Sequence, residues 1–371
     1  MPFDVRDFPA APPEDQAAGR RNRRLVSAWL FAMCAMLLVM IALGGATRLS
    51  GSGLSIMEWA PLLGTLPPLS EAEWQRLFGL YKTIPQYALV NTGMDLAGFK
   101  GIFWLEWLHR FWGRVLGVAF LGPLVWFWAT GRIERRLRPR LACIFVLGGM
   151  QGVVGWFMVA SGFFPDATAV APIRLVVHLS LALVLYAAVF WTGLLVRHPY
   201  PAPDVPRPGL RALVIAAVVL IALTILAGGF VAGLKAGLTY NTFPLMDGRL
   251  VPVGYARLEP FWRNLMENIA TVQFNHRVLA TLTLIVVSIA FVGAWRVPAA
   301  HPARLALVAL GALGAVQYVI GIVTLVLVVP MDMGTLHQAM AVLVLTAALA
   351  GLYALRPAPP KLESSYSRDQ T

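Results

Sequence analysis

The chain has 371 residues, of which 58% are hydrophobic and 13% charged, and its mean hydropathy is +0.70. No soluble domain of this length needs so much apolar surface, so the composition excludes a soluble enzyme and predicts an all-α integral membrane protein. The net charge of +12 would suit a nucleic-acid binder. However, the basic residues lie in short segments between apolar runs, so we expect no nucleic-acid partner and a lipid membrane as the surroundings.

Eight apolar segments are long enough to cross a bilayer core as helices, which takes about 20 residues each. They lie near residues 25–47, 107–129, 141–161, 173–196, 210–233, 271–295, 305–329 and 335–355. The first segment is long and has no small-residue cleavage site after it, so it is interpreted as a span and not as a cleavable signal. Cys34 and Cys143 both fall inside spans, and we expect them to be buried free thiols.

Arginine is concentrated in every second connection between these spans. It clusters in residues 19–24, 131–140 and 197–211, whereas the connections 162–173 and 330–334 contain no Lys or Arg. The positive-inside rule then predicts that the tails, residues 1–24 and 356–371, are both cytoplasmic. The first tail is too acidic for an organelle transit peptide, which favours a bacterial inner membrane.

Two sequence patterns recur with nearly the same spacing. "GGMQGVVGWFMV" in the third span is followed by "GAVQYVIGIVTL" in the seventh, which places Gly, Gln and Gly 166 residues apart, at Gly148/Gly314, Gln151/Gln317 and Gly155/Gly321. A His-Arg pair recurs after 167 residues, as "EWLHRFWGR" and "QFNHRVLAT". The pattern predicts two four-helix bundles, 25–197 and 210–355, that form a parallel repeat joined by a cytoplasmic linker, 198–209.

Each predicted half has one long external connection, near residues 48–105 and 234–270. The first contains the amphipathic stretch "SEAEWQRLFGLYKTI" at 70–84. We expect such stretches to lie on the outer surface as short helices.

Four of the six histidines fall near the starts of spans two, four, six and eight, at His109, His178, His276 and His337. A single histidine in a span is often only a structural hydrogen-bonding residue, but recurrence at equivalent places favours a function. Zinc would require three or four clustered ligands, often with thiolates. Opposed pairs of imidazoles suit the axial positions of haem iron, which predicts one haem in each half.

The residues beside the first histidine of each pair differ between the halves. Glu106 lies three residues before His109, on the same helix face, whereas the equivalent residue before His276 is Gln273. The carboxylate favours a role in proton-coupled chemistry, with a favourable interaction with the helix dipole as the alternative. Arg110 and Arg277 follow the histidines and are candidates to bind haem propionates, or else they are interfacial arginines.

Together these motifs resemble haem A synthase. The resemblance rests on "ExxHR" at Glu106–Arg110, "QxxHR" at Gln273–Arg277, the two further histidines and "GGATRLSGSGLS" at 44–55, and it covers residues 25–355. It implies an oxidoreductase that converts the C8 methyl group of haem O to a formyl group, giving haem A for cytochrome oxidase. Some members carry a Cys pair in the first external loop, and this chain resembles the subtype that lacks it.

The resemblance also implies how the site residues divide. Haem O as substrate would bind between His109 and His178, haem b as cofactor between His276 and His337, and Glu106 would be the catalytic carboxylate. Haem O synthase as the supplier, an external electron acceptor or donor, and a homo-oligomer are the expected partners. The alternative functions are a di-haem b-type electron-transfer cytochrome, which leaves the Glu/Gln difference unexplained, and a proton-relay transporter.

Overall fold

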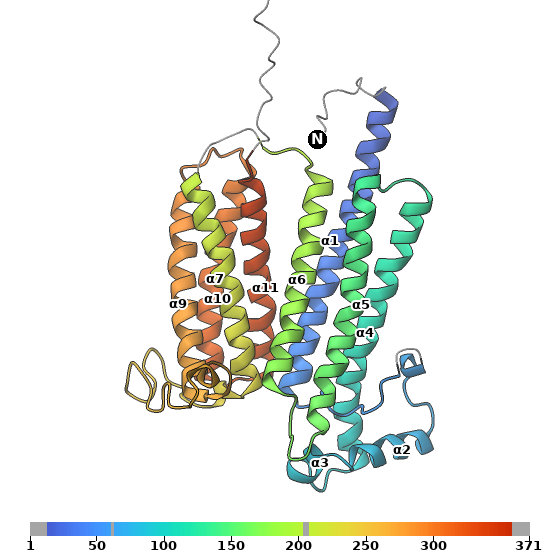
Figure 1. Cartoon of the computed structure of the whole chain (residues 1–371), viewed down its shortest axis with the longest axis vertical. Helices are drawn as coiled ribbons and strands as arrows, with labels where there is room; N and C mark the ends of the chain where they lie inside the picture. Colours follow the sequence, from blue (N-terminus) through green and yellow to red (C-terminus); the bar gives the residue numbers. More distant parts are fainter. Residues whose placement is uncertain (1–12, 61–62, 203–207, 358–371) are drawn as a thin grey trace, which may run out of the picture.

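The computed structural model describes residues 13–60, 63–202 and 208–357, and these ranges are helical without any strand longer than an isolated bridge. Eight helices within them are long and apolar enough to span a membrane, as predicted. They are α1 (Pro13–Leu49), α4 (Leu96–Ala129), α5 (Arg138–Ala160), α6 (Pro172–Arg197), α7 (Pro208–Gly233), α9 (Ile269–Ala294), α10 (Pro302–Val326) and α11 (Met331–Ala354) (Figure 1).

Six of these helices begin and end close to the predicted limits, but α1 begins at Pro13 and not near residue 25, and α4 begins at Leu96 and not near residue 107. Asp95 caps its first turn by accepting a hydrogen bond from the Gly98 amide at 2.8 Å. The additional turns carry Phe99 and Phe103, which are buried against external residues. Hydropathy cannot detect this extension, because the extra turns are covered by protein and not by lipid.

Most of the short helices lie at one end of the bundle, the end that the sequence predicts to be external. They are η1 (Leu63–Thr65), α2 (Glu71–Tyr81), α3 (Pro85–Leu89), η3 (Ser161–Phe163), η4 (Ala236–Leu238), η5 (Phe261–Arg263) and α8 (Asn264–Glu267), whereas η2 (Arg135–Leu137) lies at the opposite end. The expected amphipathic helix is α2, capped by Ser70. Its Trp74 ring packs edge-on against Phe103 of α4 at 4.8 Å, so this helix fixes the outer part of α4.

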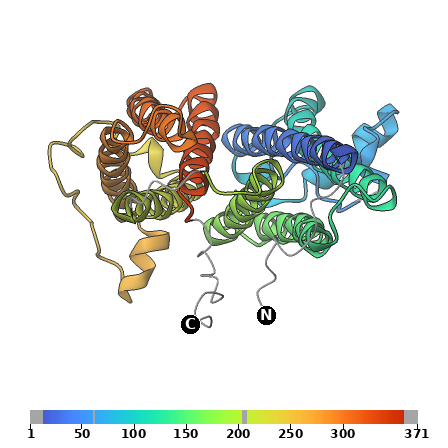
Figure 2. The same cartoon turned by 90° about the horizontal axis from the view of Figure 1, so that it is seen from above.

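The eight long helices lie in two groups side by side (Figures 1 and 2). In the first group, α1 and α5 each pack against both α4 and α6; in the second, α7 and α10 each pack against both α9 and α11. Helices α4 and α6 therefore face each other across the first group, and α9 and α11 across the second. The predicted division into 25–197 and 210–355 stays a prediction, and this packing pattern is in keeping with it.

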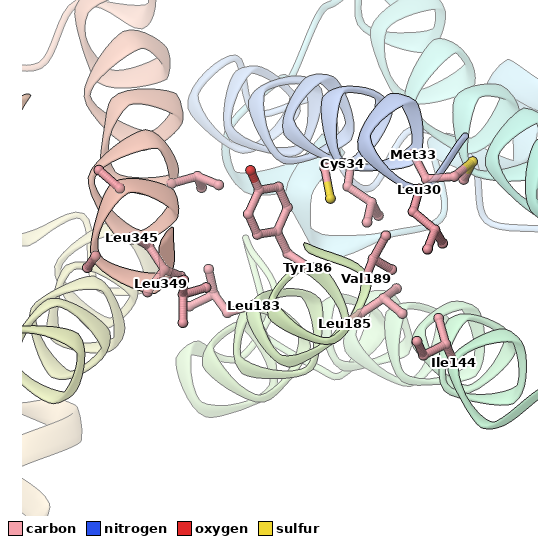
Figure 3. Close-up of a cluster of buried hydrophobic side chains, with 14 of the residues drawn as sticks. Leu30, Met33, Cys34, Ile144, Leu183, Leu185, Tyr186, Val189, Leu345 and Leu349 are labelled. Carbon is pink, nitrogen blue, oxygen red and sulfur yellow. The ribbon is translucent and has the colours of Figure 1, made fainter. Parts of the chain in front are cut away.

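The contact between the groups is formed by α1 and α6 with α7 and α11. One continuous apolar core extends across it, in which Tyr186 of α6 lies between α1 and α11 (Figure 3). The Tyr186 hydroxyl is 2.7 Å from Thr346 Oγ1 of α11. Cys34 is buried in this core, but Cys143 is exposed, so the expectation of burial is wrong for Cys143.

Candidate functional site

The four predicted histidines occupy the helices that face each other within each group. His109 lies on α4 and His178 on α6; His276 lies on α9 and His337 on α11. His198 and His301, to which we assign no function, lie at helix ends outside these pairs: the His301 side chain caps α10 and the His198 carbonyl accepts from Tyr353. The structure therefore separates the four candidate ligands into one pair in each group.

Each of the four imidazoles lies against a glycine of an adjacent helix. A Cβ atom at the glycine would come within 2.8 to 3.1 Å of the imidazole Cε1, for the pairs Gly44/His109, Gly155/His178, Gly228/His276 and Gly321/His337. Any side chain at these positions would displace the ring. The recurrence of Gly155 and Gly321 is visible in the sequence, but their contact with the histidines is not.

The second pair has the geometry that two axial ligands require. The His276 and His337 ring centroids are 6.4 Å apart and the rings are nearly perpendicular, at 87°. An iron atom bound by two imidazoles holds their centroids roughly 6 Å apart, because each metal–nitrogen bond is about 2 Å. His276 Nδ1 lies 3.0 Å from the Thr224 carbonyl, so a proton on Nδ1 leaves Nε2 free as a ligand.

The first pair has ring nitrogens without a protein partner. Nδ1 of both His109 and His178 is buried without a hydrogen-bond partner in the described structure. Buried polar atoms usually have partners, so this pair is suited to an external group. No group of three or more His, Cys, Asp or Glu that could hold a metal ion occurs among the described residues.

A glutamine orients the second histidine of each pair. Gln151 Nε2 of α5 donates to the His178 carbonyl at 3.0 Å, and Gln317 Nε2 of α10 donates to the His337 carbonyl at 3.0 Å. The same amide nitrogens lie 3.3 and 3.1 Å from ring nitrogens of these histidines. The sequence marked both glutamines as repeated, but only the structure reveals that they contact the candidate ligands.

Glu106 is 2% exposed and is surrounded by hydrogen-bond donors. Its Oε2 accepts from Ser55 Oγ at 2.7 Å and from the Ile56 amide at 2.9 Å. Its Oε1 accepts from Arg110 Nη2 at 2.6 Å and Nε at 3.0 Å. The carboxylate therefore holds the first external loop against α4.

Gln273 is equally buried and holds the second external loop, but with the opposite hydrogen-bond polarity. Its Nε2 donates to the carbonyls of Ala236 at 2.9 Å and Thr239 at 2.6 Å. The loops thus present donors to the glutamate and acceptors to the glutamine. This complementarity is a structural reason for the Glu/Gln difference, in addition to the chemical one expected from the sequence.

The two candidate propionate-binding arginines are both bonded to loop carbonyls. Arg110 donates to Ile56 O at 2.6 Å and Glu58 O at 2.9 Å, in addition to its ion pair with Glu106. Arg277 donates to Thr242 O at 2.8 Å and Tyr240 O at 2.5 Å. Both arginines thus hold a loop beside a histidine pair through hydrogen bonds to its carbonyl groups. The binding of haem propionates by these arginines stays a prediction.

These features define a membrane-embedded protein with two pairs of partly buried histidines, one in each helix group. Comparison with known proteins identifies the family: residues 27–349 match COX15-CtaA, described as cytochrome oxidase assembly protein, and the chain belongs to this family. It is 58% identical over 339 residues to "Heme A synthase" of Granulibacter bethesdensis, covering 91% of this chain and 89% of that protein. It is 49% identical over 351 residues to "Heme A synthase 2" of Acidiphilium cryptum, covering 93% and 95% of the two chains.

Proposed function

We propose that the protein is a haem A synthase, a membrane oxidoreductase that converts haem O to haem A by oxidising the C8 methyl group to a formyl group. The single observation that carries this proposal is the presence of two opposed histidine pairs, of which only one has a carboxylate beside it. The names of its relatives support the same activity. The formyl product requires the removal of four electrons in two steps, through a hydroxymethyl group and a hydrated aldehyde that loses water.

We further infer that the chain is a duplicated protein with a substrate half, 25–197, and a cofactor half, 210–355. The equivalent helix contacts in the two groups and the repeated glycines and glutamines support this division. Haem O then binds between His109 and His178, and haem b between His276 and His337. When bound, haem b supplies one-electron exchange between the site and an external redox partner.

The residues of the second half hold the two imidazole ligands of the cofactor in fixed orientations. Thr224 fixes the proton of His276 on Nδ1, Gln317 holds the backbone of His337, and Gly228 and Gly321 leave no space for the rings to turn. Preorganised ligands of this kind lose little freedom when they bind a metal.

In the substrate half, Glu106 acts as a fixed negative charge next to His109. Four hydrogen bonds occupy its oxygens, so its lone pairs are engaged while the external loop is in place. Stabilisation of positive charge that develops at the substrate methyl carbon therefore fits this geometry better than proton transfer. Loop movement that breaks the contacts of Ser55 and Ile56 would be required before Glu106 could act as a base.

The same proposal places the protein in the bacterial inner membrane with both tails in the cytoplasm. The Arg-rich connections lie at one end of the bundle and the long loops at the other, which supports this orientation (Figure 1). Haem O synthase would supply the substrate within the membrane, and the electron partner would act at the external side. A homo-oligomer is compatible with this arrangement.

Histidine substitutions test the division between the halves. In His276→Ala and His337→Ala, haem b should be absent from the purified protein, whereas His109→Ala and His178→Ala should retain it and lose haem O binding. His198→Ala is the matched control, because its side chain lies outside both pairs. Absorption spectra and extracted haem measure both outcomes, and equal loss of haem b from all four variants would refute the division.

A further inference from the structure

Helices α5 and α10 align residue by residue through their repeated Gly, Gln and Gly positions. The same spacing of 166 residues places Gly152 of α5 opposite Tyr318 of α10. A glycine in one half thus corresponds to a large aromatic residue in the other. Both positions directly follow the glutamine that contacts a candidate haem ligand, so they lie at the depth of the histidines.

In the second group, Tyr318 closes the seam between α9 and α10. Its hydroxyl is 2.9 Å from Thr281 Oγ1 of α9. Thr281 donates its own proton to the Arg277 carbonyl, so Tyr318 is the donor between the two helices. Phe243 of the external loop packs edge-on against the Tyr318 ring at 6.2 Å. Further along the seam, a Cβ at Gly314 would lie 2.8 Å from Val287 of α9, so the helices are in close contact.

In the first group, the equivalent part of the seam between α4 and α5, at the depth of the histidines, is open. A Cβ atom at Gly148, Gly149 or Gly152 would meet no atom within 4 Å beyond its own helix. Helix α4 touches α5 far less extensively than α9 touches α10. The external end of this seam is covered by Trp59, which stacks on Trp156 at 5.2 Å, and these side chains are 51% and 45% exposed.

We propose that the α4–α5 seam is the lateral passage through which haem O moves between the bilayer and His109 and His178, and that Tyr318 closes the equivalent passage and retains haem b. This inference rests on the proposed function. A substrate must enter and its product must leave in every cycle, whereas a cofactor must stay. Because the lipid tails are as apolar as the helix surfaces, a seam in a membrane is held by close packing and hydrogen bonds. At the depth of the histidines, the Tyr318–Thr281 hydrogen bond links the helices of the second group, whereas α4 and α5 pack together nearer the other end, where Phe120 stacks on Phe145.

The first test is the rate at which purified protein in detergent transfers haem b to apomyoglobin. In Tyr318→Gly, this rate should rise about tenfold or more, because substitutions within one binding site act mainly on dissociation. Tyr318→Phe, which keeps the ring but loses the hydrogen bond, should be intermediate. Val319→Gly is the matched control: it places the same helix-weakening residue at a 58% exposed neighbour and should leave the rate unchanged.

The outcomes distinguish this inference from the proposed function. If wild-type protein carries no haem b, the proposed function fails. If haem b is present and Tyr318→Gly releases it at the wild-type rate, only the inference fails. Loss of all haem b during purification of Tyr318→Gly, with retention in Val319→Gly, would be the extreme form of the expected result.

The reciprocal test introduces a tyrosine into the seam between α4 and α5. Gly152→Tyr should slow the binding of added haem O about tenfold while haem b transfer stays at the wild-type rate. Val153→Tyr, at a 52% exposed neighbour, is its control. Equal haem O binding rates in wild type and both variants would overturn the passage between α4 and α5.

Discussion

Glu106 and Gln273 hold equivalent loops with hydrogen bonds of opposite polarity. In Glu106→Gln, one oxygen becomes an NH₂ group that faces either the Ile56 amide beside Ser55 or Arg110, and both the amide and the guanidinium can only donate. An unpaired buried polar group costs about 1–3 kcal/mol. We therefore expect this variant to have a lower melting temperature as well as less haem A.

The reverse substitution in the second half, Gln273→Glu, should lower both the melting temperature and the haem b content of the protein. Gln273→Glu places a carboxylate oxygen against the carbonyls of Ala236 and Thr239, which accept hydrogen bonds from the amide. Thermal unfolding and haem content of both single variants measure these effects. If Glu106→Gln unfolds at the wild-type temperature but makes no haem A, the role of Glu106 is chemical and not that of a loop anchor.

The glycines beside the histidines lead to a prediction about ligand orientation. In Gly228→Ala, the new Cβ would lie 3.0 Å from His276 Cε1, so the ring must turn or the helices must separate. We expect a changed low-spin electron paramagnetic resonance spectrum of haem b and faster haem loss. Gly209→Ala in the same helix meets open space and is the control. An unchanged spectrum in Gly228→Ala would contradict the positioning role.

At the scale of elements, the first external loop is linked to α2 by ion pairs. Arg76 donates to both oxygens of Glu58, at 2.7 and 2.8 Å, and also to Glu73. The Arg76 hydrogen bonds hold the pKa of the Glu58 carboxyl below its ordinary value. Glu58 follows Ile56 closely, so this pair supports the loop that contacts Glu106.

Removal of this ion pair should loosen the loop slightly. In Arg76→Gln, amides 56–60 should exchange hydrogen faster at pH 7. Because the ion pair is exposed, the free energy of local opening of the loop should fall by at most about 1 kcal/mol. A lowered carboxyl pKa stabilises the fold above its unfolded value of about 4.3, and this contribution is lost as the pH falls through the folded pKa. Lowering the pH from 7 to 5 should therefore leave the protection of amides 56–60, relative to the exchange of an unfolded chain at the same pH, unchanged.

Arg263→Gln provides the control for this experiment. It breaks a similarly exposed pair with Glu267 in the other external loop, far along the chain from Glu58. If both variants change the exchange of amides 56–60 equally, the Arg76 pair has no specific role in the loop.

The positions of the spans and of the histidines within them could be predicted from the sequence, but the contacts around the histidines could not. Hydropathy locates α7 and α9 well because both helices are apolar along most of their length. Two of the donors around Glu106, Ser55 and Ile56, lie 51 and 50 positions earlier in the chain, and the glycine opposite His109 lies on another helix. Such contacts depend on tertiary packing, which no local pattern encodes. The equivalence of Gln273 and Glu106 in sequence even conceals their opposite surroundings.

At the scale of the whole molecule, the two helix groups are joined as one body. Arg48 of α1 donates to the carbonyls of Ala232 and Gly233 at the end of α7, and Gln338 of α11 donates to Ile41 of α1 at 2.9 Å. These contacts lie one turn from Gly44 and Gly228, against which His109 and His276 pack. The two histidine pairs are thus held in a fixed arrangement relative to each other.

In the proposed protein, one histidine pair binds a resident haem b and the other binds haem O and forms haem A. Chromatography of the haems extracted from purified wild-type protein distinguishes this arrangement from the alternatives. We expect haem B together with haem O or haem A. Haem B alone at both sites would indicate an electron-transfer cytochrome, and a protein without a Soret band would contradict haem binding altogether.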